Sequence, residues 1–258
     1  MDRFSLRGRT ALVTGASRGI GNGIARGLAE AGADIGVVYR QTADQADAFV
    51  DELLTMGRSR SFAHQADVTK KSEIDGMVDT ALSRWSKIDI LVNNAGTGRG
   101  VAAEEMSEET WDFIVDLNLK SVFFTSQAVG RQMISQGGGS IINVGSISAL
   151  IVNNPQKQCH YNAAKAGVHM LTKCLAVEWV KHNIRVNAIA PGYVETDLTR
   201  PFMEENPEEA EKLWKMGTLQ ERFSAPSEMA GAAVYLASDA STFVTGEVMV
   251  VDGGYTLR

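Results

Sequence analysis

Short apolar runs alternate with longer segments in which apolar residues recur every three or four positions, along the whole chain. A short continuous apolar run predicts a buried strand, and the longer periodicity predicts an amphipathic helix. The predicted strands are Thr10–Thr14, Ile35–Tyr39, Ser61–His64, Ile88–Val92, Ser140–Val144, Arg185–Ala190 and Glu247–Val251. The predicted helices are Ile20–Leu28, Ala46–Leu54, Ile74–Trp85, Trp111–Met133, His160–Val180 and Ser227–Ala237.

This alternation indicates one class of fold. Strands that are apolar along their whole length belong to parallel sheets covered by helices on both faces. We therefore predict a doubly wound α/β fold of the Rossmann type, with a central parallel sheet of about seven strands. No segment rich in proline and glycine divides the chain, so residues 1–258 are expected to form a single domain.

Charge and cysteine content narrow the class of protein. The net charge of −6 argues against a nucleic-acid-binding face, which would need an excess of basic residues. No window approaches the roughly 20 apolar residues of a membrane span, and residues 1–8 contain no apolar stretch of signal-peptide length. Cys159 and Cys174 lie about 22 Å apart along one predicted helix, too far for a disulfide. We expect a cytoplasmic protein that binds neither nucleic acid nor membrane, and we expect no metal site.

A cluster of glycines follows the first predicted strand. The run Thr14-Gly15-Ala16-Ser17-Arg18-Gly19-Ile20-Gly21 has the spacing G-x-x-x-G-x-G. Glycines at such a turn let the main chain approach a pyrophosphate, and the helix N-terminus supplies amide donors and a favourable dipole. The strand before and the helix after favour a dinucleotide-binding loop over a simple tight turn. We expect cofactor contacts from Gly15, Ser17, Arg18, Gly19, Ile20 and Gly21.

The end of the second predicted strand bears on the choice of cofactor. In this fold a carboxylate at that edge binds the adenosine ribose hydroxyls and favours NAD. This chain has Tyr39 there, followed by Arg40, and Arg18 lies in the glycine loop. Two guanidinium groups suit a 2′-phosphate, whose oxygens match their planar donors. The pattern favours NADP(H), with NAD(H) as the alternative if Arg40 only stacks on the adenine or faces solvent.

Tyr161 and Lys165 stand four residues apart in a predicted helix, so both side chains project from one face. A free phenol has a pKa of about 10 and is a poor acid or base at neutral pH. A neighbouring cation favours the phenolate and lowers that pKa. The pair is a candidate for proton transfer, although the same spacing also occurs on ordinary exposed helix faces.

With these features in order, the chain resembles the short-chain dehydrogenase/reductase family over essentially its whole length, and its sugar and polyol members above all. The matching motifs are Thr14–Gly21, Asp67-Val68, Asn93-Asn94-Ala95-Gly96, Asn118, Ser146, Tyr161 with Lys165, Pro191-Gly192, Thr196, Thr245-Gly246 and Val251-Asp252-Gly253-Gly254. The resemblance implies further cofactor contacts, from Tyr39, Arg40, Asp67, Val68, Asn94, Ala95, Gly96, Tyr161, Lys165, Pro191, Gly192, Val194 and Thr196.

The resemblance also implies an activity, hydride transfer between nicotinamide and a carbonyl or carbinol carbon. Tyr161 would exchange the proton, and Lys165 would lower its pKa and bind the nicotinamide ribose. Asn118 would hold a water that relays protons from Lys165, and Ser146 would stabilise charge on the substrate oxygen. Ser148 has the family's commoner spacing from the tyrosine, but Asn143-Val144-Gly145-Ser146 matches its N-x-x-S pattern, so we assign Ser146.

The segment before Tyr161 bears on the substrate. Asn153, Gln156 and Gln158 resemble the V-N-x-P-Q-x-Q segment of ketose reductases and polyol dehydrogenases in the family. Amide side chains can pair with substrate hydroxyls, which are costly to bury unpaired. The expected substrate residues are Ser146, Ser148, Asn153, Gln156, Gln158 and Tyr161. The alternative is that the amides only tie down their own loop. Arg99 is able to meet a carboxylate or phosphate, or simply faces solvent.

Three functions follow as hypotheses. The first is an oxidoreductase acting on a sugar, polyol or small hydroxy-ketone. The second is a 3-oxoacyl-[acyl-carrier-protein] reductase, which would need a basic docking patch, whereas residues 204–211 are acidic. The third is a non-catalytic NADP-binding scaffold or sensor, which the complete set of candidate catalytic residues disfavours.

The resemblance also suggests how the chain is organised. Residues 1–145 would form the cofactor half and residues 146–258 the catalytic and substrate half. The long stretch 198–220, between a strand end and the next predicted helix, is a candidate lid. The family usually forms homotetramers, which the late apolar residues permit: Phe243, Val244, Val248, Met249 and Leu257.

Overall fold

A seven-stranded sheet in the order β3-β2-β1-β4-β5-β6-β7 organises the computed structural model, which describes residues 2–257. All neighbouring strands are parallel, as the apolar runs predict. The strands are β1 Thr10–Thr14, β2 Asp34–Tyr39, β3 Phe62–Gln65, β4 Ile90–Asn93, β5 Gly139–Val144, β6 Ile184–Pro191 and β7 Val248–Val251. The doubly wound fold and the single Rossmann-like domain are confirmed.

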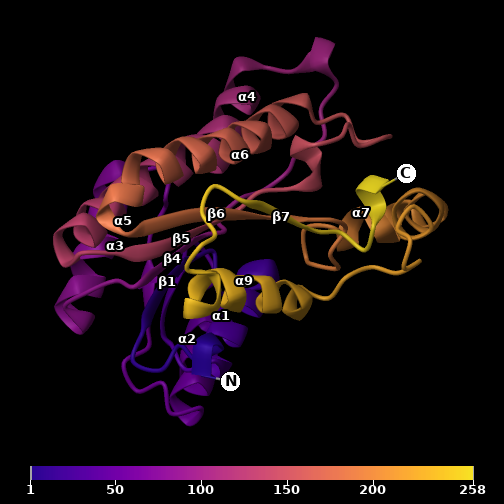
Figure 1. Ribbon diagram of the computed structural model, residues 1–258. Coiled ribbons are helices and arrows are strands. Elements are labelled where there is room, and N and C mark those ends of the chain that lie inside the picture. The colour runs from indigo at the N-terminus through magenta and orange to yellow at the C-terminus, as the bar shows by residue number, and fades with distance from the viewer. Residues whose placement is uncertain (1, 258) are drawn as a thin grey trace.

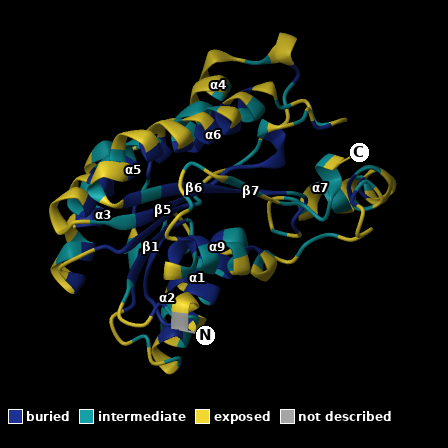
Figure 2. Ribbon diagram, viewed as in Figure 1, coloured by how far each residue is buried: buried dark blue, intermediate teal, exposed yellow. Residues whose placement is uncertain are grey.

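Helices cover both faces of the sheet (Figure 1). The helices are α1 Gly19–Glu30, α2 Ala43–Thr55, α3 Lys71–Trp85, α4 Glu108–Val115, α5 Ser121–Gln136, α6 Cys159–Trp179, α7 Arg200–Glu205, α8 Pro207–Glu209 and α9 Ala230–Ala237. Apolar side chains of α1, α2 and α9 form one core against the sheet, and those of α3, α5 and α6 form the other. The central strands are buried between these layers (Figure 2).

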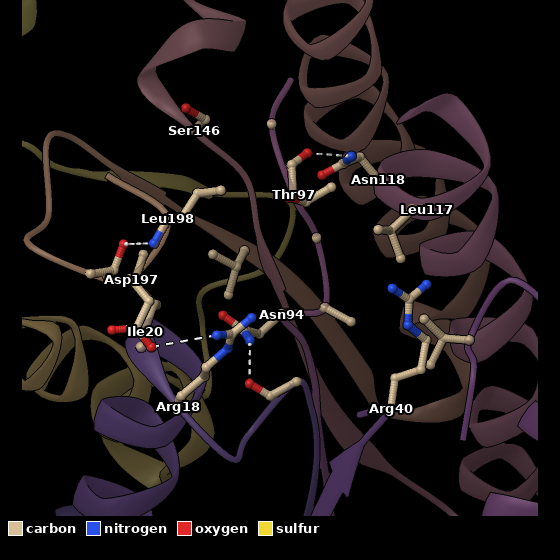
Figure 3. A pocket seen from close by; sticks show the side chains of 18 of the residues that line it. Arg18, Ile20, Arg40, Asn94, Thr97, Leu117, Asn118, Ser146, Asp197 and Leu198 are labelled. Atoms are coloured by element: carbon tan, nitrogen blue, oxygen red, sulfur yellow. Dashed lines mark hydrogen bonds and ion pairs between the residues drawn. The ribbon is translucent and has the colours of Figure 1, made fainter. Parts of the chain in front are cut away.

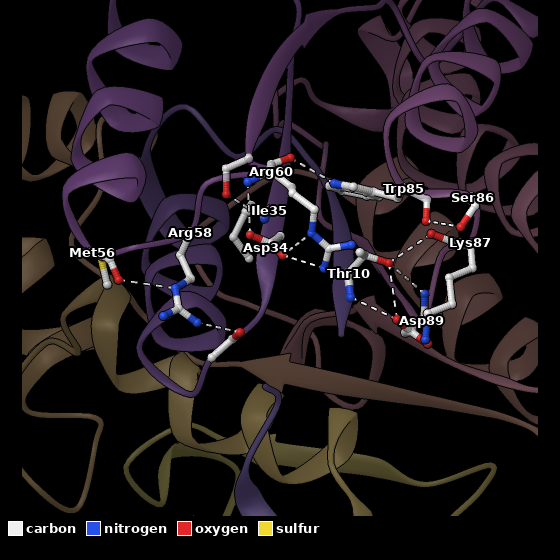
Figure 4. Close-up of polar contacts among 12 residues, drawn as sticks. Thr10, Asp34, Ile35, Met56, Arg58, Arg60, Trp85, Ser86, Lys87 and Asp89 are labelled. Carbon is white, nitrogen blue, oxygen red and sulfur yellow. Dashed lines mark hydrogen bonds and ion pairs between the residues drawn. The ribbon is translucent and has the colours of Figure 1, made fainter. Parts of the chain in front are cut away.

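Ion pairs and hydrogen bonds connect the strands at the amino-terminal edge of the sheet (Figure 4). Arg60 Nε donates to a carboxylate oxygen of Asp34 at 2.9 Å, where β2 begins. The main-chain N–H of Thr10, at the start of β1, donates to Asp89 at 3.0 Å. Because ligands of open α/β sheets bind beyond the carboxyl ends of the strands, this network is structural and lies opposite the expected site.

At the carboxyl edge, the strand order reverses between β1 and β4, which opens a crevice where ligands of this fold bind. The main-chain N–H groups of Asn94 and Ala95 donate to Thr14 Oγ1 at 3.0 and 3.1 Å. Asn94 Nδ2 also donates to the Thr14 carbonyl oxygen at 2.9 Å. These bonds fix the two segments that border the crevice relative to one another.

Two segments differ from the sequence-based prediction. The single helix expected over Trp111–Met133 is α4 and α5 joined by a π-helical turn, Asp116–Lys120. The stretch 198–220 is largely helical rather than an open loop, with α7, α8 and a second π-helical turn, Ala210–Lys215. Two prolines at helix starts and the burial of Trp214 explain the second difference, since its side chain packs against Tyr193. Other boundaries move slightly; the first turn of the last predicted helix is a 3-10 turn, Pro226–Met229.

Within residues 2–257, no helix combines the length and the hydropathy that crossing a bilayer requires. The same part of the chain contains no group of three or more His, Cys, Asp or Glu side chains arranged to hold a metal ion.

Candidate active site

A cavity of about 600 Å³ runs along the carboxyl ends of the central strands (Figure 3). Its lining comes from the glycine loop, the ends of β2, β4, β5 and β6, the α4–α5 turn and the first turns of α6. Arg40 and Ser146 lie far apart across this lining, so the cavity is elongated. Its shape suits an extended ligand with chemistry at one end.

Backbone conformation and close contacts require glycine at three positions of the glycine loop. Gly15 and Gly19 have φ values of +65° and +57°, which side chains other than glycine rarely adopt. A Cβ on Gly21 would stand 2.3 Å from the Gly15 carbonyl oxygen, so this glycine allows the loop to fold onto α1. Gly21 itself does not line the cavity, whereas Ser17, Arg18, Gly19 and Ile20 do. The N-terminus of α1 therefore faces the cavity and favours an anion there.

Two arginines line the cavity near this loop, Arg40 directly after β2 and Arg18 in the loop itself, and they lie apart (Figure 3). Arg40 Nη1 lies 3.8 Å from an oxygen of Asp67, and Arg18 Nη1 lies 3.5 Å from an oxygen of Asp197. Burial alone would raise the pKa of Asp67, but hydrogen bonds from Thr69 and the charge of Arg40 bring it below its usual value. Both arginines are about half exposed and line the cavity, so their guanidinium groups are available to an anionic ligand.

Ser146, Tyr161 and Lys165 meet at the other end of the cavity. Ser146 directly follows the residue after β5, and the other two lie one turn apart on α6. Lys165 is 4% exposed, and burial lowers its pKa to about 8. Burial raises the pKa of the Tyr161 phenol, and the neighbouring Ser146 hydroxyl acts in the opposite direction. The phenol therefore stays protonated at neutral pH.

The Lys165 ammonium lies near the Tyr161 ring, but its hydrogen bond goes to the main chain. It donates to the Val144 carbonyl oxygen at 2.9 Å and lies 5.6 Å from the centroid of the Tyr161 ring. The carbonyl at the end of β5 attracts the ammonium because it offers a buried acceptor. In this structure burial raises the pKa of Tyr161 and Ser146 lowers it; the lowering by Lys165 that the resemblance implies stays a prediction.

Asn118 lies in the π-helical turn between α4 and α5 and is fully buried. Its Nδ2 donates to the carbonyl oxygens of Thr97 at 2.9 Å and Ile114 at 3.0 Å. Its Oδ1 is buried and finds no hydrogen-bond partner among residues 2–257. A Cβ built on Gly96 would lie 2.7 Å from this oxygen and 3.6 Å from Lys165 Nζ. A buried acceptor beside an ammonium, with only a glycine between them, suits a polar ligand atom or a water.

The structure distinguishes the two candidate serines. Ser146 lines the cavity and Ser148 does not. The Ser146 hydroxyl accepts from the main-chain N–H of Ser148 at 3.1 Å, which orients it as the cap of a short 3-10 turn. Ser148 Oγ instead accepts from Gln158 at 3.4 Å. The geometry agrees with the choice of Ser146.

The amides of the segment before Tyr161 bond to one another rather than lining the cavity. Asn153 Nδ2 donates to the Tyr193 hydroxyl at 3.0 Å, and that hydroxyl donates to Gln156 at 3.2 Å. Gln158 Nε2 lies 3.4 Å from Asn153 Oδ1. This arrangement matches the alternative in which the amides tie down their loop; their contact with a substrate stays a prediction.

The cavity brings together nearly all of the expected cofactor and catalytic residues. Those that line it are Gly15, Ser17, Arg18, Gly19, Ile20, Tyr39, Arg40, Asp67, Val68, Asn94, Ala95, Gly96, Asn118, Ser146, Tyr161, Lys165, Pro191, Gly192, Val194 and Thr196. Sequence reasoning missed Phe113, Leu117, Thr42 and Leu198, which also line it. Phe113 and Leu117 stand four residues apart on the segment that carries Asn118, a spacing that would have placed them on one face.

Comparisons with known proteins identify the family of this chain. A family model described as enoyl-(acyl carrier protein) reductase matches residues 15–256. The galactitol 2-dehydrogenase of Rhizobium johnstonii is 41% identical over 258 residues, covering 98% of this chain and 97% of the relative. A 3-oxoacyl-[acyl-carrier-protein] reductase from Synechocystis is 40% identical over 254 residues, covering 98% and 99%.

A solved structure carries the same fold with a ligand bound. A gluconate 5-dehydrogenase from Burkholderia cenocepacia, in complex with NADP and tartrate, superposes with a TM-score of 0.89. It is 39% identical, over 100% of this chain and 98% of that one. The chain belongs to the short-chain dehydrogenase/reductase family, close to its sugar and polyol dehydrogenases.

Proposed function

We propose that this protein is an NAD(P)-dependent oxidoreductase that moves a hydride between nicotinamide and a carbonyl or secondary alcohol. The expected substrate is a sugar, a polyol or a small hydroxy-ketone. One observation carries the proposal: Ser146, Tyr161, Lys165 and the unpartnered oxygen of Asn118 stand at one end of a cavity whose remainder is lined by the glycine loop and two arginines. That arrangement pairs a proton-transfer group with a dinucleotide-binding crevice.

The residues of this chain fit the dinucleotide. The N-terminus of α1 faces the cavity for a pyrophosphate, and Arg40, directly after β2, would meet a 2′-phosphate, with Arg18 of the glycine loop as the second candidate. NADP(H) is therefore the favoured cofactor, and the NADP bound to the gluconate 5-dehydrogenase supports this assignment. NAD(H) is the alternative. When bound, the nicotinamide supplies or accepts the hydride.

The protein itself binds and orients the substrate and moves the proton. Tyr161 holds a proton on its phenol oxygen at neutral pH, because burial raises its pKa, and would donate it to the carbonyl oxygen in reduction. The Ser146 hydroxyl would donate a hydrogen bond to the same oxygen as negative charge develops on it. Lys165 would hold the nicotinamide ribose and, with Asn118 and a bridging water, would return protons from solvent.

The activities named for the relatives and the charge of the α7–α8 surface both favour a sugar or polyol as the substrate. The galactitol 2-dehydrogenase favours a sugar or polyol. The Synechocystis relative and the shared catalytic group keep 3-oxoacyl thioester reduction as the second candidate. That candidate is weaker because the exposed α7–α8 segment carries Glu204, Glu205, Glu208 and Glu209, which would repel an acidic carrier protein. A non-catalytic scaffold is disfavoured by the four assembled groups.

We also propose the organisation that the family suggests. Residues 1–145 would serve the cofactor, residues 146–258 the chemistry and the substrate, and 198–220 would be the lid, because its Leu198 borders the cavity. A homotetramer is supported by apolar side chains that stand exposed on α6 and near the C-terminus, including Val177, Phe243 and Leu257. A cytoplasmic location is part of the same proposal.

Initial rates, followed by nicotinamide absorbance, test the function. Galactitol and glucitol are paired with NADP⁺ and NAD⁺, and ketoses, diketones and a 3-oxoacyl thioester are paired with NADPH and NADH. Turnover of a polyol or ketose is expected. Turnover confined to the thioester would favour the second candidate, and binding of NADPH without any turnover would favour the scaffold.

A further inference from the structure

The segment 97–101 crosses from the cofactor crevice to the loop before Tyr161 and is fixed at both ends. The Thr97 carbonyl oxygen accepts from Asn118 Nδ2 at 2.9 Å. The main-chain N–H of Val101 donates to the Lys157 carbonyl oxygen at 2.8 Å. Arg99 stands between these two anchors, so its main chain is held beside the reactive end of the cavity. Arg99 is among the residues that line that cavity, and it is exposed.

Arg99 differs from the other charged residues of the cavity in having no partner. The charged side chains of the lining are Arg18, Arg40, Asp67, Arg99, Lys165 and Asp197. Arg18 pairs with Asp197 and Arg40 pairs with Asp67, while Lys165 donates to a main-chain carbonyl. Within residues 2–257, no hydrogen bond or ion pair engages the Arg99 guanidinium. It is therefore a cation available to a ligand in the cavity.

The surroundings of Arg99 strengthen its attraction for an anion. Both acidic side chains of the lining already have arginine partners, so neither competes for Arg99. A second cation, the exposed Lys157, lies on the segment that hydrogen-bonds to Val101. Gly98 and Gly100 flank Arg99, and an added Cβ on Gly98 would meet nothing within 4 Å. The main chain at Gly98, next to Arg99, therefore borders open space.

We infer that Arg99 binds a carboxylate at the end of the substrate, so that the preferred substrate is a hydroxy acid or keto acid derived from a sugar rather than a neutral polyol. This inference rests on the proposed function and narrows its substrate class. A guanidinium presents two parallel donors that match the two oxygens of a carboxylate. One arginine suffices for a monoanion, whereas a phosphate dianion is usually met by several donors. The ligand of the Burkholderia relative, tartrate, is itself a hydroxy carboxylate.

The test compares substrates that differ only in the charged end. D-gluconate and D-glucitol form one such pair, and D-galactonate and galactitol form another; glucitol 6-phosphate serves as the phosphate probe. The wild-type protein is assayed with NADP⁺ beside Arg99→Gln and Arg99→Lys. Arg131→Gln is the matched control, because Arg131 is an exposed arginine on α5 that does not line the cavity.

We expect the ratio of kcat/KM for the acid to that for its matched polyol to fall at least about tenfold in Arg99→Gln. The decrease should be smaller in Arg99→Lys, which keeps the charge but not the paired donors, and absent in Arg131→Gln. An unchanged ratio in Arg99→Gln, with polyols still oxidised, would overturn the inference and leave the proposed function standing. A preference for the phosphorylated polyol that depends on Arg99 would overturn the assignment of a carboxylate. Absence of turnover with these acids and polyols, and with the ketoses assayed under the proposed function, would refute the proposed function and this inference together.

Discussion

The buried ammonium of Lys165 donates a hydrogen bond to the carbonyl oxygen of Val144, at 2.9 Å, at the end of the strand that leads to Ser146. The bond links the helix that carries Tyr161 to the turn that carries Ser146. It also leaves a charge in a buried position, where it lowers the stability of the fold. The same lysine thus positions the site and weakens the protein that contains it.

The first prediction concerns the pH dependence of stability. Burial lowers the pKa of Lys165 from 10.5 to about 8. Between these values the unfolded chain binds more protons at this lysine than the folded chain, so the free energy of unfolding rises with pH. Relative to Lys165→Met, the wild-type protein should gain about 2 kcal/mol between about pH 7 and about pH 9.5. Urea unfolding of both proteins at several pH values measures the difference, and a constant difference would contradict a buried, depressed lysine.

The second prediction concerns the space between Gly96, Asn118 and Lys165. An alanine at position 96 would place a Cβ 2.7 Å from Asn118 Oδ1 and displace whatever that oxygen binds. We expect Gly96→Ala to lower kcat roughly 100-fold, the scale of a lost proton-transfer contribution. Gly76→Ala is the control, because a Cβ on Gly76 meets nothing within 4 Å. Wild-type kcat in Gly96→Ala would show that this space has no part in turnover.

The third prediction concerns cofactor choice. Arg40 is about half exposed and holds Asp67 only loosely, at 3.8 Å, so it can turn to a 2′-phosphate. Replacing it with alanine should reduce the ratio of kcat/KM for NADPH to that for NADH at least about tenfold, through loss of a charge-assisted hydrogen bond. Arg40→Asp should carry the preference further, toward NADH. If steady-state rates show the same ratio in Arg40→Ala as in the wild type, Arg40 does not read the phosphate.

The fourth prediction concerns the segment 198–220. The Trp214 ring stacks between Phe202, at 4.3 Å between centroids, and Tyr193, at 4.6 Å. These contacts hold the helical segment against Tyr193, which follows Gly192 just after the end of β6. Trp214→Ala should expose the segment and speed its cleavage by trypsin roughly tenfold or more, whereas Trp214→Phe should stay close to the wild type. Equal cleavage rates in all three proteins would mean that the stack does not hold the segment in place.

The fold could be predicted because its strands are buried on both faces and therefore apolar throughout, as Ile141 and Ile142 in β5 illustrate. The glycine loop could be predicted because only glycine meets its conformational demands at Gly15 and Gly19. In both cases the constraint is local, so the residue types reveal it directly.

Other features depend on contacts that the sequence does not display. The π-helical turn at Asn118 is built from residues that are ordinary in an α-helix, so the sequence does not reveal it. The helical segment 198–220 is held by the stacking of Trp214 on Tyr193, which lies outside that segment. The spacing of Tyr161 and Lys165 predicted that both lie on one face of the helix. It did not predict that the ammonium would donate a hydrogen bond to the Val144 carbonyl oxygen.

The most direct test of the account is Tyr161→Phe, which removes only the phenol oxygen. NADPH binding is measured by fluorescence titration, and turnover is measured with the best substrate of the wild-type protein. The account predicts a dissociation constant within about twofold of the wild type and a kcat reduced roughly 10²- to 10⁴-fold, because proton transfer is lost. A Tyr161→Phe protein with wild-type turnover would contradict it.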